Sequence, residues 1–390
     1  MRKSSLFTAM TLLCAVSFGF TSCSDDDDEP KLHSIEVAQP QAGGTISVNP
    51  EEALPGDVVT LSATVDEKWV FNGWTVTAGD AEVTVEDPTA LETTFVMPAA
   101  SVSVAAEFLA PGEKFGLSTV LIPAGTRMLG SEPTEPSYYK DEMLHEVTIS
   151  KDFYMSQYEI TNEQYAAFLN ATGVGADGKG DVPSLGSNEI LIYDSSTQDS
   201  NKYNFGVNFN GNEWVAAAGY EKNPVIYVTW YGAAAFADYV GGALPTEAQW
   251  EYACRGGQTE QLPFGIGDGT KMEKGMAAFY FYDYYDLAKG GRVVDMDIPG
   301  YKSSTYPVGS FLPNAWKLYD MHGNVYEWCA DWYGNYPTEP SVDPAGPESG
   351  SQRIVRGGGW VNSGRELRTA VRWEFRPTNH LENLGFRVVL

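Results

Sequence analysis

The feature that most constrains this chain is a run near its C-terminus that is rich in glycine and arginine. Three consecutive glycines, Gly357–Gly359, are followed directly by Trp360 within the segment 353–390. Glycine adopts backbone angles that other residues avoid, and it lets a second backbone or a ligand approach closely. The segment ends in the run 385–390, which predicts a final buried strand. The fold must therefore accommodate a tight glycine turn, which belongs either to a working active site or to the scaffold of one.

Bulk composition narrows the function. The chain has 390 residues, enough for two or three domains, and a net charge of −27. Such an acidic chain is not expected to bind nucleic acid, which requires basic patches. Its four histidines show no metal-ligand spacing, so a zinc or iron site built on neighbouring histidines is not expected.

The N-terminus has the pattern of an exported protein. A basic start and an apolar stretch predict a signal peptide over residues 1–22. The sequence before Cys23 resembles a bacterial lipobox, which implies lipidation of Cys23 and a membrane tether without a spanning helix. The alternative is an ordinary signal peptide with an incidental cysteine. Residues 23–32 form an acidic linker. It resembles the surface-export signal of Bacteroidetes lipoproteins, which predicts an outer-membrane, cell-surface location. The alternative is a plain spacer.

Residues 33–109 predict a small all-β module. Short alternating or β-branched runs at 44–48, 58–63 and 102–108 are separated by turn residues. The region resembles the divergent internalin-B-type B-repeat, which implies a spacer or adhesive unit. Trp74 is expected in its core.

The remaining residues, 114–390, form the larger domain. Helix-capping residues precede two apolar helical patterns, at Thr161 and at Thr246. Several phrases in order resemble the formylglycine-generating enzyme family, also called sulfatase-modifying factors: Ile122–Gly125, Tyr158–Asn162, Asn223–Val225, Leu244–Ala253, Gly323–Trp328, Arg356–Trp360 and Leu384–Arg387. The resemblance implies an irregular, loop-rich α+β fold of the C-type-lectin-like kind.

The family resemblance also implies where chemistry would take place. Active members oxidise a cysteine of a client sulfatase with copper and O₂, and two cysteine thiolates after the glycine motif hold the copper. Here the first of these positions is Asn362, and the second falls in a shortened stretch without cysteine. Because Cu(I) prefers soft thiolate ligands, we expect neither copper nor formylglycine chemistry.

Two further sites are predicted in this domain. Cys254 and Cys329 are the remaining cysteine pair, and they form either a structural disulfide or two buried thiols. The resemblance implies a calcium site in the loop 318–328, with ligands matching Asp320, Gly323, Val325 and Glu327. Carboxylate and carbonyl oxygens are the ligands that calcium prefers; the alternative is that these residues only order the loop.

These expectations combine into one functional hypothesis. The chain is a surface-exposed lipoprotein whose family domain acts as a binding or structural unit for a protein, peptide or glycan. Its expected ligand cleft is formed by Trp360, Asn362, Arg365, Arg368, Arg372 and Trp373, although the arginines could equally form salt bridges within an acidic protein. The alternatives are a formylglycine-type oxidoreductase acting on protein cysteines, and a component of a cell-envelope secretion or gliding assembly.

Overall fold

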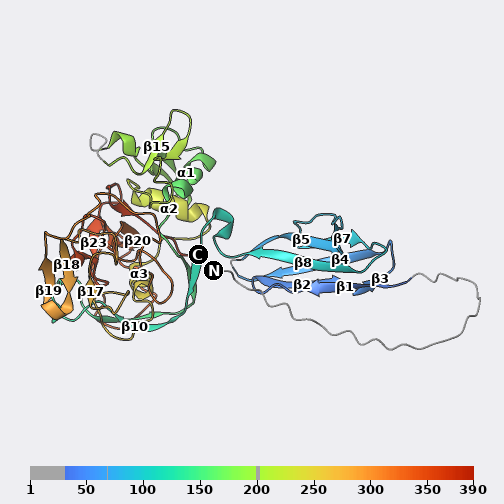
Figure 1. Cartoon of the computed structure of the whole chain (residues 1–390), viewed down its shortest axis with the longest axis horizontal. Coiled ribbons are helices and arrows are strands. Elements are labelled where there is room, and N and C mark those ends of the chain that lie inside the picture. Colours follow the sequence, from blue (N-terminus) through green and yellow to red (C-terminus); the bar gives the residue numbers. More distant parts are fainter. Residues whose placement is uncertain (1–30, 68, 199–202) are drawn as a thin grey trace, which may run out of the picture. The chain divides into compact units, whose positions relative to one another are not determined.

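The structure is a computed structural model that describes residues 31–67, 69–198 and 203–390. The predicted signal peptide, Cys23 and most of the acidic linker lie outside the described residues. The chain divides into two compact units (Figure 1). One unit takes in the residues up to Gln39, Ile46–Ala63 and Gly73–Ala106, and the other takes in the rest, including Glu107–Leu390.

The first unit is built from β-strands. A five-stranded sheet has the order β3-β1-β8-β5-β6, and a three-stranded sheet has the order β2-β4-β7. Alternate residues point inward, so that Val59, Leu61 and Val104 are fully buried. Trp74 is buried as expected. The strands are β1 (His33–Ala38), β2 (Gly44–Asn49), β3 (Glu52–Ala53), β4 (Val58–Val65), β5 (Val70–Ala78), β6 (Ala81–Glu82), β7 (Glu92–Val96) and β8 (Val102–Leu109).

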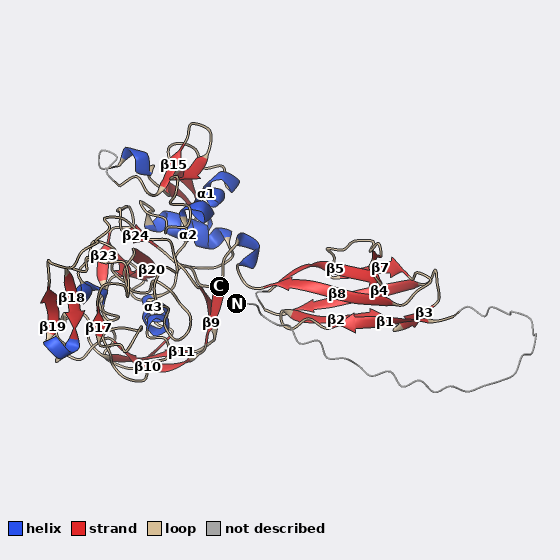
Figure 2. Cartoon of the chain, in the orientation of Figure 1, coloured by secondary structure: helices blue, strands red, loops and turns tan. Residues whose placement is uncertain are grey.

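The second unit contains three α-helices among its described residues: α1 (Asn162–Ala171), α2 (Trp230–Tyr239) and α3 (Glu247–Cys254) (Figure 2). Thr161 caps α1 and Thr246 caps α3, each in a capping box with the glutamine three residues later. These are the two helix starts that the sequence predicted. The unit is loop-rich α+β, as expected. None of the described helices has the length and apolarity needed to cross a membrane.

Many short strands complete this unit, and the sheet that positions the site has the order β23-β22-β20-β24. Strand β20 is almost entirely buried, and it carries two acidic residues, Glu327 and Asp331, that belong to different sites described below. The strands are β9 (Thr119–Ile122), β10 (Gly125–Leu129), β11 (His145–Ile149), β12 (Phe153–Ser156), β13 (Lys179–Val182), β14 (Ser187–Ile190), β15 (Val207–Phe209), β16 (Trp214–Ala216), β17 (Lys271–Met272), β18 (Asp283–Asp286), β19 (Gly291–Val294), β20 (Tyr326–Trp332), β21 (Ser341–Val342), β22 (Arg353–Arg356), β23 (Trp373–Phe375) and β24 (Leu384–Gly385).

The C-terminal run is buried but is less regular than predicted. Only Leu384–Gly385 forms a named strand, parallel to β20. Beyond it the backbone pairs in isolated bridges, with Val389 opposite both Met155 and Ala243. The run therefore inserts between two segments instead of extending one ladder. This places Arg387 and Phe386 in the fully buried core.

Candidate functional site

The glycine motif forms a turn that leads from β22 into the expected copper position. Gly357 has φ of +91° and Gly358 has φ of +73°, a conformation that side chains disfavour. A Cβ added at Gly357 would lie 3.2 Å from Trp250. The turn directs Trp360 inward, where its indole nitrogen donates to the Glu382 carbonyl oxygen at 3.0 Å.

Asn362 is held in a hydrogen-bond network at the position where the sequence predicted the first copper ligand. Its side-chain oxygen accepts a hydrogen bond from the Gly359 amide at 2.9 Å, and its side-chain nitrogen donates to the Tyr326 hydroxyl at 3.0 Å. The Asn383 amide approaches the same oxygen at 3.5 Å, and the backbone oxygen of Asn362 accepts from the Tyr280 amide at 2.8 Å. Both ends of the side-chain amide are therefore used to hold the turn, and its donor set does not suit copper.

The two cysteines of the domain are free, buried thiols. The disulfide considered from the sequence is thus not formed, and the alternative of two buried thiols describes the structure. Cys254 lies 3.6 Å from the Nε2 atom of His322, which also accepts a hydrogen bond from the Gly265 amide. Burial raises the pKa of the Cys254 thiol to about 12, so it remains protonated and unreactive at neutral pH.

The structure does not bring the residues of the expected arginine-lined cleft together at one site. Arg368 is buried by Glu135 and Glu142, whose carboxylates lie 2.5 and 2.7 Å away. Arg372 is buried on Glu247, to which its Nε atom donates at 2.8 Å. Each of these glutamates lies more than 100 residues from its arginine in the sequence. The residues around the arginines therefore did not indicate the ion pairs.

The aromatic residues of that cleft also diverge. Trp360 is buried against Tyr203 and Phe205, whereas Trp373 is 39% exposed. Arg365 and Asn362 are only partly buried. The structure therefore uses most of the predicted residues to stabilise the fold, and only Arg372 lines the cavity described below.

The expected calcium loop forms a buried acidic centre. Asp320 accepts a hydrogen bond from the Gly309 amide at 2.6 Å. Glu327 is bound by Arg387 at 2.6 Å and accepts a hydrogen bond from the indole nitrogen of Trp250 at 2.7 Å. Both carboxylates come from the predicted set, and the structure adds Glu159, which sequence reasoning missed.

Glu159 adds a third buried carboxyl group to this centre. It accepts hydrogen bonds from the Asn324 side chain at 2.7 Å and from the Val325 amide at 3.2 Å. Burial, Asp320 and Glu327 raise its pKa well above the usual value, and burial raises the pKa of Asp320 to about 6. Three buried carboxyl groups thus share one guanidinium, and without a further cation the raised pKa values favour the protonated forms of Glu159 and Asp320.

The fit to calcium is incomplete, because the Glu327 carboxylate is already bound by Arg387. In the part of the chain that the structure describes, no three histidine, cysteine, aspartate or glutamate side chains are grouped as a metal site. Calcium here would therefore depend on Asp320 together with the carbonyl oxygens of the loop. The ligand roles of Gly323 and Val325 stay predictions.

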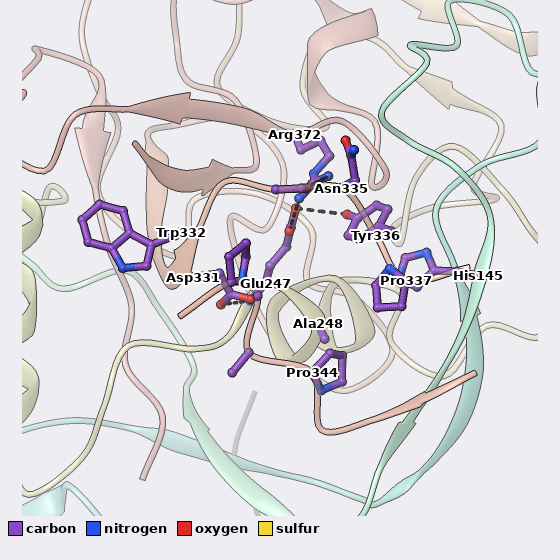
Figure 3. A pocket seen from close by; sticks show the side chains of 14 residues that line it. His145, Glu247, Ala248, Asp331, Trp332, Asn335, Tyr336, Pro337, Pro344 and Arg372 are labelled. Carbon is purple, nitrogen blue, oxygen red and sulfur yellow. Dashed lines mark hydrogen bonds and ion pairs between the residues drawn. The ribbon is translucent and has the colours of Figure 1, made fainter. Parts of the chain in front are cut away.

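A separate cavity of about 340 Å³ opens beside the N-terminus of α3 (Figure 3). Its walls include Glu247 and Ala248 of α3, Asp331 of β20, Arg372, and three prolines. Tyr336 is held between the ring of His145, at 3.9 Å, and the guanidinium of Arg372, also at 3.9 Å. The prolines are Pro337, Pro344 and Pro347.

The two carboxylates of this cavity, Glu247 and Asp331, differ in their hydrogen-bond and ion-pair partners. Glu247 is bound by Arg372 and accepts a hydrogen bond from the Tyr336 hydroxyl at 3.0 Å. Asp331 accepts a hydrogen bond from the Glu247 amide at 2.8 Å but forms no ion pair with any described residue. Burial and the nearby Glu247 charge raise the pKa of Asp331 to about 7.

Comparison with known proteins identifies the family of this chain. The model of the sulfatase-modifying factor enzyme 1-like domain matches residues 107–390, and the model of the divergent InlB B-repeat domain matches residues 35–111. The chain belongs to the sulfatase-modifying factor family. Its N-terminal β unit is a divergent InlB B-repeat, as the sequence predicted. The glycine turn and Asn362 lie within the part of the chain that the family model matches.

Individual relatives agree with this assignment. The chain is 30% identical over 284 residues to the formylglycine-generating enzyme of Mus musculus, covering 69% of this chain and 73% of that enzyme. It is 34% identical over 274 residues to the serine/threonine-protein kinase pkn1 of Chlamydia caviae. That match covers 69% of this chain but only 37% of the kinase. The solved structure of PvdO from Pseudomonas aeruginosa matches with a TM-score of 0.50 and 28% identity, covering 70% of this chain and 93% of PvdO.

Proposed function

We propose that the sulfatase-modifying factor domain of this chain acts as a binding unit and does not convert cysteine to formylglycine. The observation that supports this most strongly is the network at Asn362. Its amide bonds to Gly359 and Tyr326, so the position serves the turn. An amide supplies hard oxygen and nitrogen atoms, whereas Cu(I) requires soft sulfur.

The remaining thiols do not offer a substitute pair. Cys254 and Cys329 are buried, and burial raises the pKa of both thiols. Deprotonation, which metal binding requires, is therefore unfavourable in the folded protein.

Copper binding tests this proposal directly. The full chain is prepared with Cys14 and Cys23 replaced by serine, so that Cys254 and Cys329 are its only thiols, and it competes with a chromogenic chelator for Cu(I). We expect the folded chain to leave the copper with the chelator, while the chain in denaturant removes it. Stoichiometric capture by the folded chain would contradict the proposal.

We propose further that the protein is held at the outer membrane by a lipid on Cys23 and faces the cell exterior. The proposal rests on the lipobox-like sequence and the acidic linker that follows it. In this arrangement the β-repeat serves as a spacer for the family domain. Replacing Cys23 by alanine is expected to move the protein from the membrane fraction to the aqueous fraction. Protease digestion of the wild-type protein on intact cells tests the orientation, and full protection would contradict a surface location.

We also propose that the acidic centre around Asp320 binds calcium. The excess of buried carboxylates over arginine supports this. Asp320 and the loop carbonyl oxygens would hold the ion, which would supply structural order and not redox chemistry.

A further inference from the structure

We propose that the cavity between α3, Asp331 and the three prolines binds a cationic side chain, an arginine or lysine presented by a peptide segment of a partner protein. The inference rests on the proposed binding role of the domain and gives that role a location and a ligand chemistry. It differs from the arginine-lined cleft expected from the sequence, because the acceptor is a carboxylate and the ligand carries the positive charge.

Asp331 is the group that a cation would contact. The side chain is only 4% exposed, yet it lines the cavity (Figure 3). Glu247 cannot serve in the same way, because Arg372 and Tyr336 already bind its two oxygens. The neighbouring arginines are also engaged: Arg356 pairs with Glu251. A buried carboxylate that lacks a cationic partner is costly, and an incoming ammonium or guanidinium would relieve that cost.

The walls suit the aliphatic part of such a side chain. Pro337, Pro344 and Pro347 offer rigid apolar surfaces, and Ala248 forms part of the wall on α3. A long lysine or arginine stem packs well against such surfaces while its charged head finds a polar partner. The volume of about 340 Å³ is within the range of small-ligand pockets.

Other ligand classes fit less well. An anion would face Asp331 at close range. A sugar usually stacks on an exposed aromatic face, but both faces of Tyr336 are covered by His145 and Arg372. One face of Trp332 is covered by the Arg353 guanidinium, 3.5 Å from the ring centre. A metal ion would find only one available carboxylate.

The charge of the whole chain favours the same ligand. With a net charge of −27, the protein attracts cationic partners at long range and repels anionic ones. A peptide is therefore a more suitable occupant than an isolated amino acid, because further basic residues would add to the steering.

Titration with capped tripeptides tests the inference. The probes are Gly-Arg-Gly, Gly-Lys-Gly and Gly-citrulline-Gly, the last being nearly the same shape as the arginine peptide but neutral. Each is titrated into the full chain and followed by nuclear magnetic resonance or calorimetry. We expect the two cationic peptides to bind at least about tenfold more tightly than the citrulline peptide, because a hydrogen bond between charged groups is lost with the neutral probe.

Two variants locate the site. Asp331→Asn keeps the shape and can still accept from the Glu247 amide, and it is expected to weaken cationic binding by about tenfold. Ala345→Trp places a bulky group on an exposed wall residue and is expected to block binding without disturbing the core. Glu146→Gln, an exposed charge on β11, is the matched control and should leave binding unchanged.

Several outcomes would overturn the inference. They are equal binding of the arginine and citrulline peptides, no binding of either cationic peptide, and unchanged binding by both Asp331→Asn and Ala345→Trp. A loss of binding with Glu146→Gln equal to that with Asp331→Asn would show general electrostatic attraction only. None of these results bears on copper, so the failure of this inference is distinguishable from the failure of the proposed function.

Discussion

Two buried aspartates, Asp320 and Asp331, lie in similar surroundings, and yet we propose different ligands for them. Each lies close to a glutamate that is already bound by an arginine: Glu327 by Arg387 and Glu247 by Arg372. Burial raises the pKa of both aspartates, to about 6 for Asp320 and about 7 for Asp331. Strand β20 connects the two centres, because it contributes Glu327 to one and Asp331 to the other.

The difference between the centres lies in the additional charges. The centre at Asp320 includes a third carboxylate, Glu159, and only one guanidinium. Around Asp331, by contrast, the neighbouring glutamates are each paired with an arginine, Glu247 with Arg372 and Glu251 with Arg356, and Asp331 itself forms no ion pair with any described residue. We therefore propose a divalent ion as the ligand of the first centre and a monovalent organic cation as the ligand of the second. The proposed difference in ligand thus depends on residues that are distant in sequence.

Removing the arginine from the first centre is expected to have the largest effect. Arg387→Ala leaves Glu327 buried without its cation and should lower the free energy of unfolding by about 3–5 kcal/mol. Urea denaturation measures this loss, and added calcium should restore part of it if the centre accepts a divalent ion. As a control, Arg292→Ala removes an exposed pair with Asp283 and should cost no more than about 1 kcal/mol. A small effect of Arg387→Ala would mean that Glu327 is solvated or protonated in the native protein.

The raised pKa of Asp331 predicts that the free energy of unfolding depends on pH. Its pKa is about 7 in the folded protein and near 3.8 when unfolded, so the folded state binds more protons between these values. The contribution of Asp331 to the free energy of unfolding therefore decreases as the pH rises from about 4 to about 7.

Burial accounts for most of this effect, and the groups that face Asp331 modify it. They are Glu247 of α3, Arg372, and Arg353 of β22, together with the thiol of Cys329 on its own strand. Asp331→Asn should be more stable than the wild type by about 2–4 kcal/mol at pH 8, while the two should differ little at pH 4. Denaturation at the two pH values measures the difference, and parallel curves for both proteins would contradict the raised pKa.

Calcium should distinguish the two centres. At about 100 times its dissociation constant, a ligand that binds only the folded state adds about 2.7 kcal/mol of stability. For a unit of this size, that is a rise in melting temperature of several degrees. We expect calcium to stabilise the chelator-treated wild type and the Asp331→Asn variant, but not Asp320→Ala, which removes the side-chain oxygen ligand. An equal response of both variants would remove the distinction between the centres.

The smallest effect is expected at Cys329, which lies between Glu327 and Asp331 on β20. Because burial raises the pKa of this thiol well above its usual value, iodoacetamide should leave it and Cys254 unmodified in the folded protein. Intact mass after alkylation, with and without denaturant, measures this. A mass that shows a disulfide, or rapid modification without denaturant, would mean that this strand is less protected than the structure indicates.

The sequence predicted those features that depend on short-range pattern. Thr161 and Thr246 begin helices because the capping residue and its glutamine partner are three positions apart. The alternating strands of the β-repeat follow from the same kind of local rule. The glycine turn was also recognisable, since Gly357 and Gly358 both have positive φ.

The candidate sites depended instead on contacts across the fold. The run 365–373 looked like a basic cleft, but Glu142 and Glu247, far away in sequence, pair with Arg368 and Arg372. Glu159 was missed because it lies 161 residues before Asp320, and nothing in its own segment marks it as part of that centre. The cavity at Asp331 was missed because its prolines and carboxylates come from separate elements.

The absence of formylglycine chemistry is the central claim, and peptide oxidation tests it most directly. The full chain is loaded with copper under air and incubated with a cysteine-containing sulfatase peptide, and the peptide mass is followed beside an active formylglycine-generating enzyme. Because Asn362 provides an amide at the position where copper would require a thiolate, we predict that the peptide cysteine remains unchanged with this chain. Conversion of that cysteine to an aldehyde at a rate that depends on both copper and the folded chain would contradict the account.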